Sequence, residues 1–142
     1  MGQSLGYLSR LAFRRFARAM EKRTQAHGVG AGQWPFLRVL WAEDGLTQRE
    51  LSQRVGMRAP TTAKALQTLE RNGLIRRAPS RMDRRKVHIF LTAGGRALKD
   101  ELMPYVEEVN ALATQGIETE DVERLRRLLA AVAANLAEDA GA

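Results

Sequence analysis

The chain has 142 residues, no cysteine, a formal net charge of +7 and a sequence pI of about 10.7. This length fits one domain with a core of its own, and the lack of cysteine excludes a disulfide framework and a thiol redox sensor. The excess of basic over acidic residues favours a nucleic acid or an anionic surface as partner. No apolar run could span a bilayer, and arginines interrupt the first twenty residues, so we expect no signal peptide and a cytoplasmic protein.

Residues 4–26 are predicted to form one amphipathic helix. Apolar residues recur near helical spacing, at Leu5, Leu8, Ala12, Phe16, Ala19 and Met20. Our main interpretation of Phe13, Phe16 and Met20 is contact with the core or with a second copy of the chain. The alternative is that they form the wall of a ligand pocket.

Residues 28–32 have the glycine-rich composition of a loop, and residues 33–42 then form a second helix with Pro35 in its first turn. Trp34 and Trp41 in this helix more often indicate packing than recognition. Arg38 lies between them and could hold a carboxylate, although a surface ion pair is the main interpretation.

A short third helix begins after Thr47. Thr47 and Glu50 have the spacing of a capping box, and Leu46 and Leu51 have that of a hydrophobic staple around it. Gly56 suits the left-handed residue that ends a helix. The helix should therefore be about ten residues long, with both ends marked.

Residues 60–72 are predicted to form the next helix, with Pro60 in its first turn. Leu66 and Leu69 give it a buried side. The opposite side is polar and basic and carries no carboxylate; it consists of Thr61, Lys64, Thr68 and Arg71. Considered alone, this side could be an ordinary solvated helix face.

A strongly basic hairpin follows. Val87, Ile89 and Leu91 alternate as in a half-buried strand, with His88 expected to face solvent, and residues 74–79 can pair with them. Asp83 is the single acid among the basic residues Arg76, Arg77, Arg81, Arg84, Arg85 and Lys86. So many like charges on a small hairpin are costly unless a polyanion is near. Two helices followed by a basic hairpin predict a winged helix-turn-helix, with one helix in a major groove and the wing on the phosphates.

A membrane partner is less favoured, because the charges concentrate in a hairpin and not along one amphipathic helix.

Two long helices are predicted after the hairpin. Thr92 is placed to cap the first, Pro104 predicts a kink in it, and Gly116 ends it. Thr119 is the candidate cap of the last helix. That helix carries a narrow apolar seam close to a heptad pattern, made of Val122, Leu125, Leu129, Val132 and Leu136. The seam could meet a partner chain or pack within the chain.

Residues 46–92 resemble the MarR family of bacterial transcription regulators. The wing signature appears as Asp83-Arg84-Arg85 followed by Leu91-Thr92, and LTQREL, LERNGLI and the upstream GQWPFLRVLW also match. The resemblance covers nearly the whole chain. It implies a mostly α-helical protein with a small β-hairpin wing, a single domain over residues 1–142 and a DNA-binding lobe at residues 46–92. It also implies homodimerisation through helices in residues 4–26 and 93–138, with Leu8 and the seam residues as contacts.

The resemblance further implies a sequence-specific regulator, expected to be a repressor, on a palindromic operator in double-stranded DNA. The expected DNA contacts are Arg58, Pro60, Thr61, Thr62, Lys64, Thr68, Arg81, Arg84, Arg85 and Lys86. Thr61, Thr62 and Lys64 are expected at bases or adjacent phosphates, and Arg58 at a phosphate near the positive end of the helix. In the family a wing arginine reaches the minor groove, and Arg84 is assigned that role. Asp83 is expected to hold the shape of the wing through an ion pair with an arginine and not to touch DNA.

The family also implies a small aromatic or anionic effector. The candidate wall residues are Phe16, Met20, Trp34, Arg38 and Trp41.

Enzyme chemistry and cofactors find little support in the sequence. His27 and His88 are the only histidines, and neither has a metal-ligand neighbour at a useful spacing. Gly94-Gly95 lacks the spacing and the lysine of a P-loop. Two other classes stay open: a winged-helix module that binds proteins, and a non-specific architectural DNA-binding protein.

Overall fold

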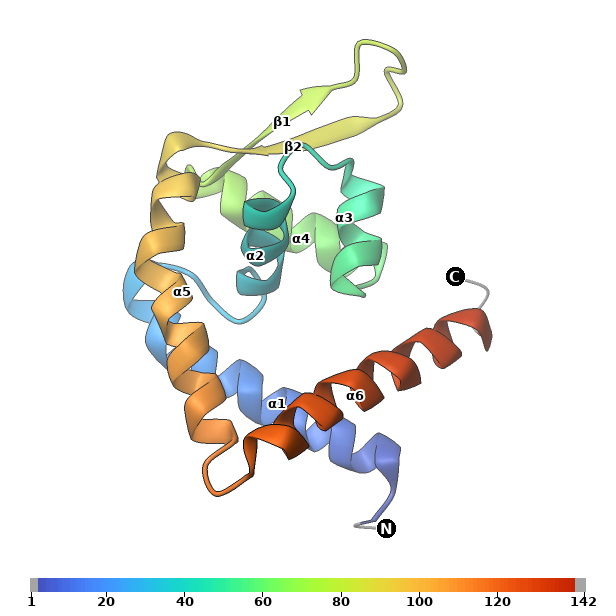
Figure 1. Cartoon of the computed structure of the whole chain (residues 1–142). Helices are drawn as coiled ribbons and strands as arrows, with labels where there is room; N and C mark the ends of the chain where they lie inside the picture. Colours follow the sequence, from blue (N-terminus) through green and yellow to red (C-terminus); the bar gives the residue numbers. More distant parts are fainter. Residues whose placement is uncertain (1–2, 140–142) are drawn as a thin grey trace. The chain divides into compact units, whose positions relative to one another are not determined.

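The computed structural model describes residues 3–139, which form helices and one two-stranded antiparallel sheet (Figure 1). The elements in chain order are α1 (Leu5–Thr24), the short 3-10 helix η1 (Gln25–His27), α2 (Trp34–Ala42), α3 (Gln48–Val55), α4 (Ala59–Arg71), β1 (Ile75–Pro79), β2 (Val87–Leu91), α5 (Ala93–Ala113) and α6 (Thr119–Asp139). The predicted mostly α-helical class with a hairpin is confirmed. The chain divides into two compact units between residues 109 and 110, within α5.

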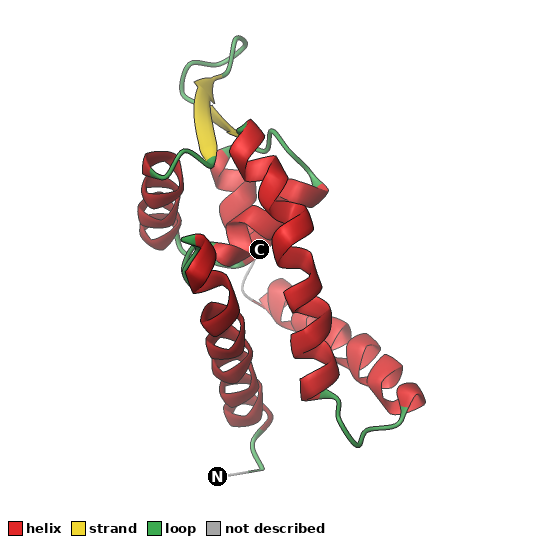
Figure 2. Cartoon of the chain, turned by 90° about the vertical axis from the view of Figure 1, so that its left-hand side faces the viewer, coloured by secondary structure: helices red, strands yellow, loops and turns green. Residues whose placement is uncertain are grey.

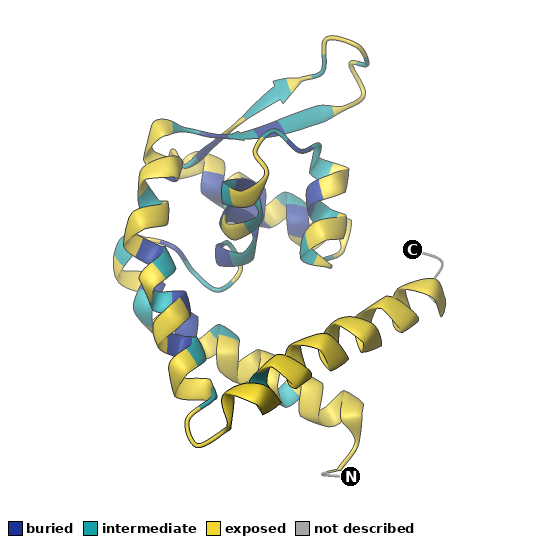
Figure 3. Cartoon of the chain, in the orientation of Figure 1, coloured by how far each residue is buried: buried dark blue, intermediate teal, exposed yellow. Residues whose placement is uncertain are grey.

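The core of the first unit joins the helix-turn-helix to the helices around it. Its fully buried large side chains include Phe36, Leu37 and Leu40 on α2, Leu51 on α3, Leu66 and Leu69 on α4, Ile75 and Ile89 on the strands and Leu102 on α5. Figure 3 shows buried residues in dark blue on several of these elements, including α2, α4 and the base of the hairpin. Burying each such side chain contributes about 1.5–3 kcal/mol, so this core holds the lobe together.

The hairpin pairs Ile75 with Leu91 at its base and Pro79 with Val87 near its tip. It extends beyond the helices of its unit (Figure 2). The other edge of β2 is also hydrogen-bonded: the Gly45 N–H donates to the Ile89 carbonyl (2.9 Å), and the Ile89 N–H donates to the Leu46 carbonyl (2.8 Å). This extra pairing was not predicted, and it fixes the segment before α3 to the root of the wing.

The alternation along the strand predicted that His88 faces solvent, but the structure differs. His88 is half-buried, and its Nδ1 lies 2.9 Å from the Gly45 carbonyl oxygen. The pairing of β2 with the segment before α3 brings these two groups together.

The start of α5 is held tightly against the wing root. Thr92 caps the helix as predicted, because its Oγ1 accepts from the Gly95 N–H at 3.0 Å. A Cβ added to Gly95 would lie 2.1 Å from the Leu74 carbonyl oxygen, so only glycine fits there. The Trp41 Nε1–H donates to the Gly95 carbonyl at 2.9 Å and ties α2 to the same point. The helix then runs through Pro104 to its end at Ala113.

The C-terminal end of α1 is bound to its surroundings by polar contacts. Thr24 is fully buried, and its hydroxyl donates to the Val29 carbonyl (2.7 Å). Arg23 Nε lies 3.1 Å from a Glu108 carboxylate oxygen on α5. His27 lies beside α5 as well, 3.3 Å from the Glu101 carboxylate and 3.3 Å from the Tyr105 hydroxyl. The C-terminal end of α1 is therefore joined to the middle of α5 within the first unit.

The second unit contains α6, which has no buried residue. The seam residues Leu125, Leu129, Val132 and Leu136 are all exposed, while Val122 is half-buried. Thr119 is the first residue of the helix and not its cap, a difference of one position. Helix α1 likewise exposes Leu5, Tyr7, Leu8, Phe13 and Phe16.

Candidate nucleic-acid interface

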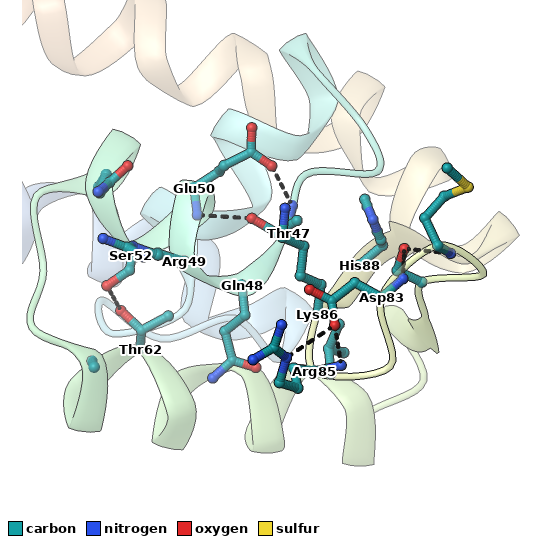
Figure 4. Close-up of a pocket in the computed structure, with 15 residues that line it drawn as sticks. Thr47, Gln48, Arg49, Glu50, Ser52, Thr62, Asp83, Arg85, Lys86 and His88 are labelled. Atoms are coloured by element: carbon teal, nitrogen blue, oxygen red, sulfur yellow. Dashed lines mark hydrogen bonds and ion pairs between the residues drawn. The ribbon is translucent and has the colours of Figure 1, made fainter.

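The turn between α3 and α4 is fixed by a small polar network (Figure 4). Gly56 ends α3 in the left-handed conformation, with φ of 77°. The Ser52 hydroxyl donates to the Met57 carbonyl (2.7 Å) and lies 2.8 Å from the Thr62 hydroxyl. Thr62 is 0% exposed, so the prediction that it contacts DNA is wrong. Because α3 packs over this position, Thr62 holds the turn instead.

The two helices of the motif have different N-termini. Thr47 and Glu50 form the predicted capping box on α3, with reciprocal hydrogen bonds of 3.0 and 3.1 Å. The hydrogen bonds from the backbone and side chain of Thr47 lower the pKa of the Glu50 carboxyl. Helix α4 begins after Arg58, whose side chain makes no cap hydrogen bond. The positive end of α4 therefore lies open to an anion, with Arg58 exposed beside it.

The outward side of α4 is polar. Its exposed residues include Pro60, Thr61, Lys64, Gln67 and Arg71. Thr68 is only half-exposed, and its hydroxyl donates to the Lys64 carbonyl at 3.3 Å, which makes it a weaker candidate contact. Gln67 was missed from the sequence, although its spacing from Thr61 and Lys64 could have indicated it.

Hydrogen bonds within the turn hold the wing tip in shape. Ser80 Oγ accepts from the backbone N–H groups of Met82 (3.2 Å) and Asp83 (3.3 Å). Asp83 Oδ1 accepts from the backbone N–H (3.0 Å) and the Nε–H (3.3 Å) of Arg85. These bonds from Arg85 lower the pKa of the Asp83 carboxyl. The expected ion pair that holds the wing through Asp83 is confirmed.

The basic residues of the hairpin fall into two groups. Arg77 at the root lies between α3 and α4, with Nη1 3.4 Å from Gln48 Oε1 and Nε 3.3 Å from Glu70 Oε1. The Nε contact is close but poorly aligned for a hydrogen bond, so its attraction is mainly electrostatic. Arg76 stacks on Phe90, 4.6 Å from the ring centre. The second group is exposed at the tip and consists of Arg81, Arg84, Arg85 and Lys86.

An open groove of about 1200 Å³ lies between α3, the start of α4 and the wing. Its charged lining includes Arg49, Arg85 and Lys86, and Figure 4 shows the labelled side chains around it. Its two carboxylates, Glu50 and Asp83, are already engaged by the hydrogen bonds described above. The groove also has polar residues of α3, Gln48 and Gln53, which the sequence did not single out. It thus offers a cationic, hydrogen-bonding surface between the outward side of α4 and the wing.

The expected effector residues are not gathered on one open surface. Met20 and Trp34 are buried in the core, and Trp41 packs edge-on against Trp34 with ring centres 5.5 Å apart. This favours the packing interpretation of Met20 and the tryptophans. Phe16 and Arg38 are exposed. The surface ion pair expected for Arg38 is not found among the described residues.

Within the part of the chain that the structure describes, no group of three or more His, Asp or Glu residues is arranged to hold a metal ion. None of the helices described has the length and apolar composition needed to cross a membrane.

Comparison with known proteins finds similar sequences and similar folds. The sequence model of the MarR family matches residues 27–86. The HTH-type transcriptional regulator TtmR of Methylorubrum extorquens (strain PA1) is 39% identical over 87 residues, which are 61% of this chain and 45% of that protein. The match thus spans less than half of that relative's length. The homoprotocatechuate degradative operon repressor of Escherichia coli is 28% identical over 103 residues, covering 72% of this chain and 70% of the repressor.

Solved structures agree over almost the whole chain. A MarR transcriptional regulator from Methanosarcina mazei Go1 superposes with a TM-score of 0.88 at 27% identity, covering 94% of this chain and 96% of that one. A putative MarR family regulator from Listeria monocytogenes, complexed with 26mer DNA, has a TM-score of 0.87 at 24% identity. The match covers 98% of this chain and 92% of that one. These proteins are described as transcription regulators and not as enzymes. Residues 27–86 thus match the MarR family in sequence, and the fold of the described chain resembles that of MarR transcriptional regulators.

Proposed function

We propose that this protein is a sequence-specific regulator that binds a palindromic operator in double-stranded DNA as a homodimer. The observation that carries the proposal is that one lobe holds two features: the outward polar side of α4, whose N-terminus has no side-chain cap, and the preshaped basic wing tip. The Escherichia coli relative is called a repressor, which supports repression as the mode of action here. Such a regulator would act in the cytoplasm, where a bacterial chromosome lies.

The roles divide between α4 and the wing. Thr61, Lys64 and Gln67 on α4 would read base edges in the major groove, because they are exposed and near one another on its outward side. Arg58 would bind a phosphate at the open end of α4. On the wing, Arg84 would enter the minor groove, while Arg81, Arg85 and Lys86 would bind phosphates.

The apolar seam of α6 supports the homodimer. A helix of 21 residues with no buried side chain leaves Leu125, Leu129, Val132 and Leu136 in water. Contiguous exposed apolar surface of this kind marks an interaction site. A second copy of the chain would cover this seam and the exposed apolar residues of α1, including Leu8 and Phe16.

We also propose that a small aromatic or anionic effector weakens DNA binding. Phe16 and Arg38 are exposed and could contact such a molecule. Met20 and Trp34 are buried in the core, and Trp41 packs against Trp34. These three residues would hold the site in place without contacting the effector. A carboxylated aromatic compound should raise the melting temperature and weaken operator binding together. A compound that stabilised the protein and left DNA binding unchanged would contradict this role.

The experiment measures binding of single variants to a library of DNA duplexes at several salt concentrations. Arg85→Ala and Lys86→Ala should weaken binding to all sequences similarly and lower the salt slope by about 1 for each phosphate that is no longer bound. Thr61→Ala and Lys64→Ala should change the ranking of sequences, by about 1–3 kcal/mol at the contacted base. Lys99→Ala, which removes an exposed charge from α5, is the control and should do neither.

The same experiment separates the competing functions. A non-specific architectural protein would bind every duplex alike, with no variant changing the ranking. A module that binds proteins would show no salt-dependent binding to DNA at all. If Thr61→Ala and Lys64→Ala left the ranking intact while the wing variants rewrote it, the division of roles would be reversed.

A further inference from the structure

The wing tip carries an exposed apolar side chain that the proposed function does not use. Met82 is 96% exposed. The other large apolar side chains exposed in the described residues lie on α1 up to Phe16 or at Leu112 and beyond, in segments assigned to assembly. Between residues 17 and 111, Met82 is therefore the one large apolar residue of the described chain that is exposed. A role in the core or in the seam does not explain it.

The turn holds Met82 at the tip by its backbone. The Met82 N–H donates to Ser80 Oγ, and the next residue, Asp83, is turned into the hydrogen bonds with Arg85. Arg81 and Arg84, on either side of this pair, are exposed. The tip thus presents a thioether between two cations, on a backbone that is ordered before any partner arrives.

This combination suits the minor groove of DNA. The flanking guanidinium groups are attracted to the phosphates on both sides of a narrow groove and to its negative potential. Proteins that enter the minor groove often insert an apolar wedge, methionine among them, against or between base steps. An unbranched thioether also adapts its shape to an irregular surface.

We propose that Met82 is an apolar minor-groove contact that adds affinity without charge and favours base steps that deform easily. This inference rests on the proposed function, since it needs the wing to meet DNA. It assigns to Met82 a role distinct from that of Arg84, which would sense the charge and width of the groove.

The test compares Met82→Gln, Met82→Leu and Arg84→Ala on duplexes that the wild-type protein selects from a random-sequence pool. Met82→Gln keeps the length of the side chain but makes it polar, and should weaken binding about tenfold, because apolar surface is no longer buried. Its salt slope should equal that of the wild type, because every phosphate remains bound. Arg84→Ala should lower the slope by about 1 per subunit. Met82→Leu should restore most of the affinity.

Two further measurements complete the test. The melting temperature of Met82→Gln should match that of the wild type, since the side chain is almost fully exposed. The loss of affinity should be largest on duplexes with a TA or CA step beneath the wing, and smaller on stiff A-tracts, because a wedge needs a deformable step.

Several results would overturn the inference. Met82→Gln could bind as the wild type does at every salt concentration, or lower the salt slope as Arg84→Ala does, or Met82→Leu could be as weak as Met82→Gln. In each case the wild type would still bind DNA, so the proposed function would stand and the role of Met82 would fall. A wild-type protein without salt-dependent DNA binding would instead overturn the proposed function, and this inference with it.

Discussion

Two adjacent threonines at the start of α4 should respond to mutation in opposite ways. Thr61 is exposed, while Thr62 is fully buried against Ser52. Thr61→Ala should change DNA sequence preference and leave the free energy of unfolding within about 0.5 kcal/mol of the wild type. Changes at Thr62 and Ser52 should lower that free energy, because they break the network that holds the turn.

The magnitudes follow from counting hydrogens. A serine hydroxyl has one hydrogen, and Ser52 donates it to the Met57 carbonyl, so Thr62 must donate to Ser52 Oγ. Thr62→Val keeps the shape and the Ser52 donation and removes one hydrogen bond, at a cost of about 1 kcal/mol. Ser52→Ala leaves both the Thr62 hydroxyl and the Met57 carbonyl without this partner. At about 1–3 kcal/mol for each buried unpaired group, Ser52→Ala should be the more harmful change.

Urea unfolding of the variants, followed by circular dichroism at one fixed protein concentration, measures this order. The expected loss is greatest for Ser52→Ala, smaller for Thr62→Val and near zero for Thr61→Ala. In the double variant of Ser52 and Thr62 the cost should be less than the sum of the single costs, because the two share one hydrogen bond. A greater loss in Thr62→Val than in Ser52→Ala would refute the assigned direction of that bond.

Three other changes test separate parts of the structure. Gly95→Ala would place a Cβ 2.1 Å from a backbone oxygen and should lower stability by about 2 kcal/mol or more; Gly94→Ala, with its nearest atoms at 3.7 Å, is the control, and equal thermal unfolding of the two would contradict the close approach. The pKa of Glu50 is lowered by its hydrogen bonds with Thr47, so its contribution to stability is present above the ordinary value of 4.5 and is lost as the pH falls through the lowered folded-state value. The difference in urea midpoint between the wild type and Glu50→Gln should therefore shrink in acid, and a difference independent of pH would exclude this mechanism. Leu129→Glu should dissociate or unfold the dimer by burying a charge in the seam, whereas Arg127→Glu on the opposite side of α6 should not; sedimentation showing the two variants in the same assembly state would argue against the seam.

The elements with strong local signals could be predicted from the sequence. The capping box of Thr47 and Glu50, the left-handed Gly56 and the cap at Thr92 each depend on residues within a few positions, and all three are present. The alternation of Val87, Ile89 and Leu91 likewise predicted the strand of the wing. Such signals act through the backbone nearby, so one sequence is enough to find them.

The errors concern contacts between distant segments. The helical projection left Thr62 out of the polar side, and its expected DNA contact came from its place near the start of α4; neither one contains the position of α3, which buries Thr62. The same projection favoured Thr68 over Gln67, although the structure exposes Gln67 more fully. The pairing of β2 with Gly45 and Leu46 joins residues more than forty positions apart, and no periodicity reports it.

That pairing has a consequence for local unfolding. Because β2 is bonded on both edges, the Ile89 amide cannot be released without disturbing the segment before α3 as well as the hairpin. The root of the wing and the connection from α2 to α3 should therefore open as one cooperative unit. Any event that loosens the connection would weaken the anchor of the wing, even though it touches neither the wing nor DNA.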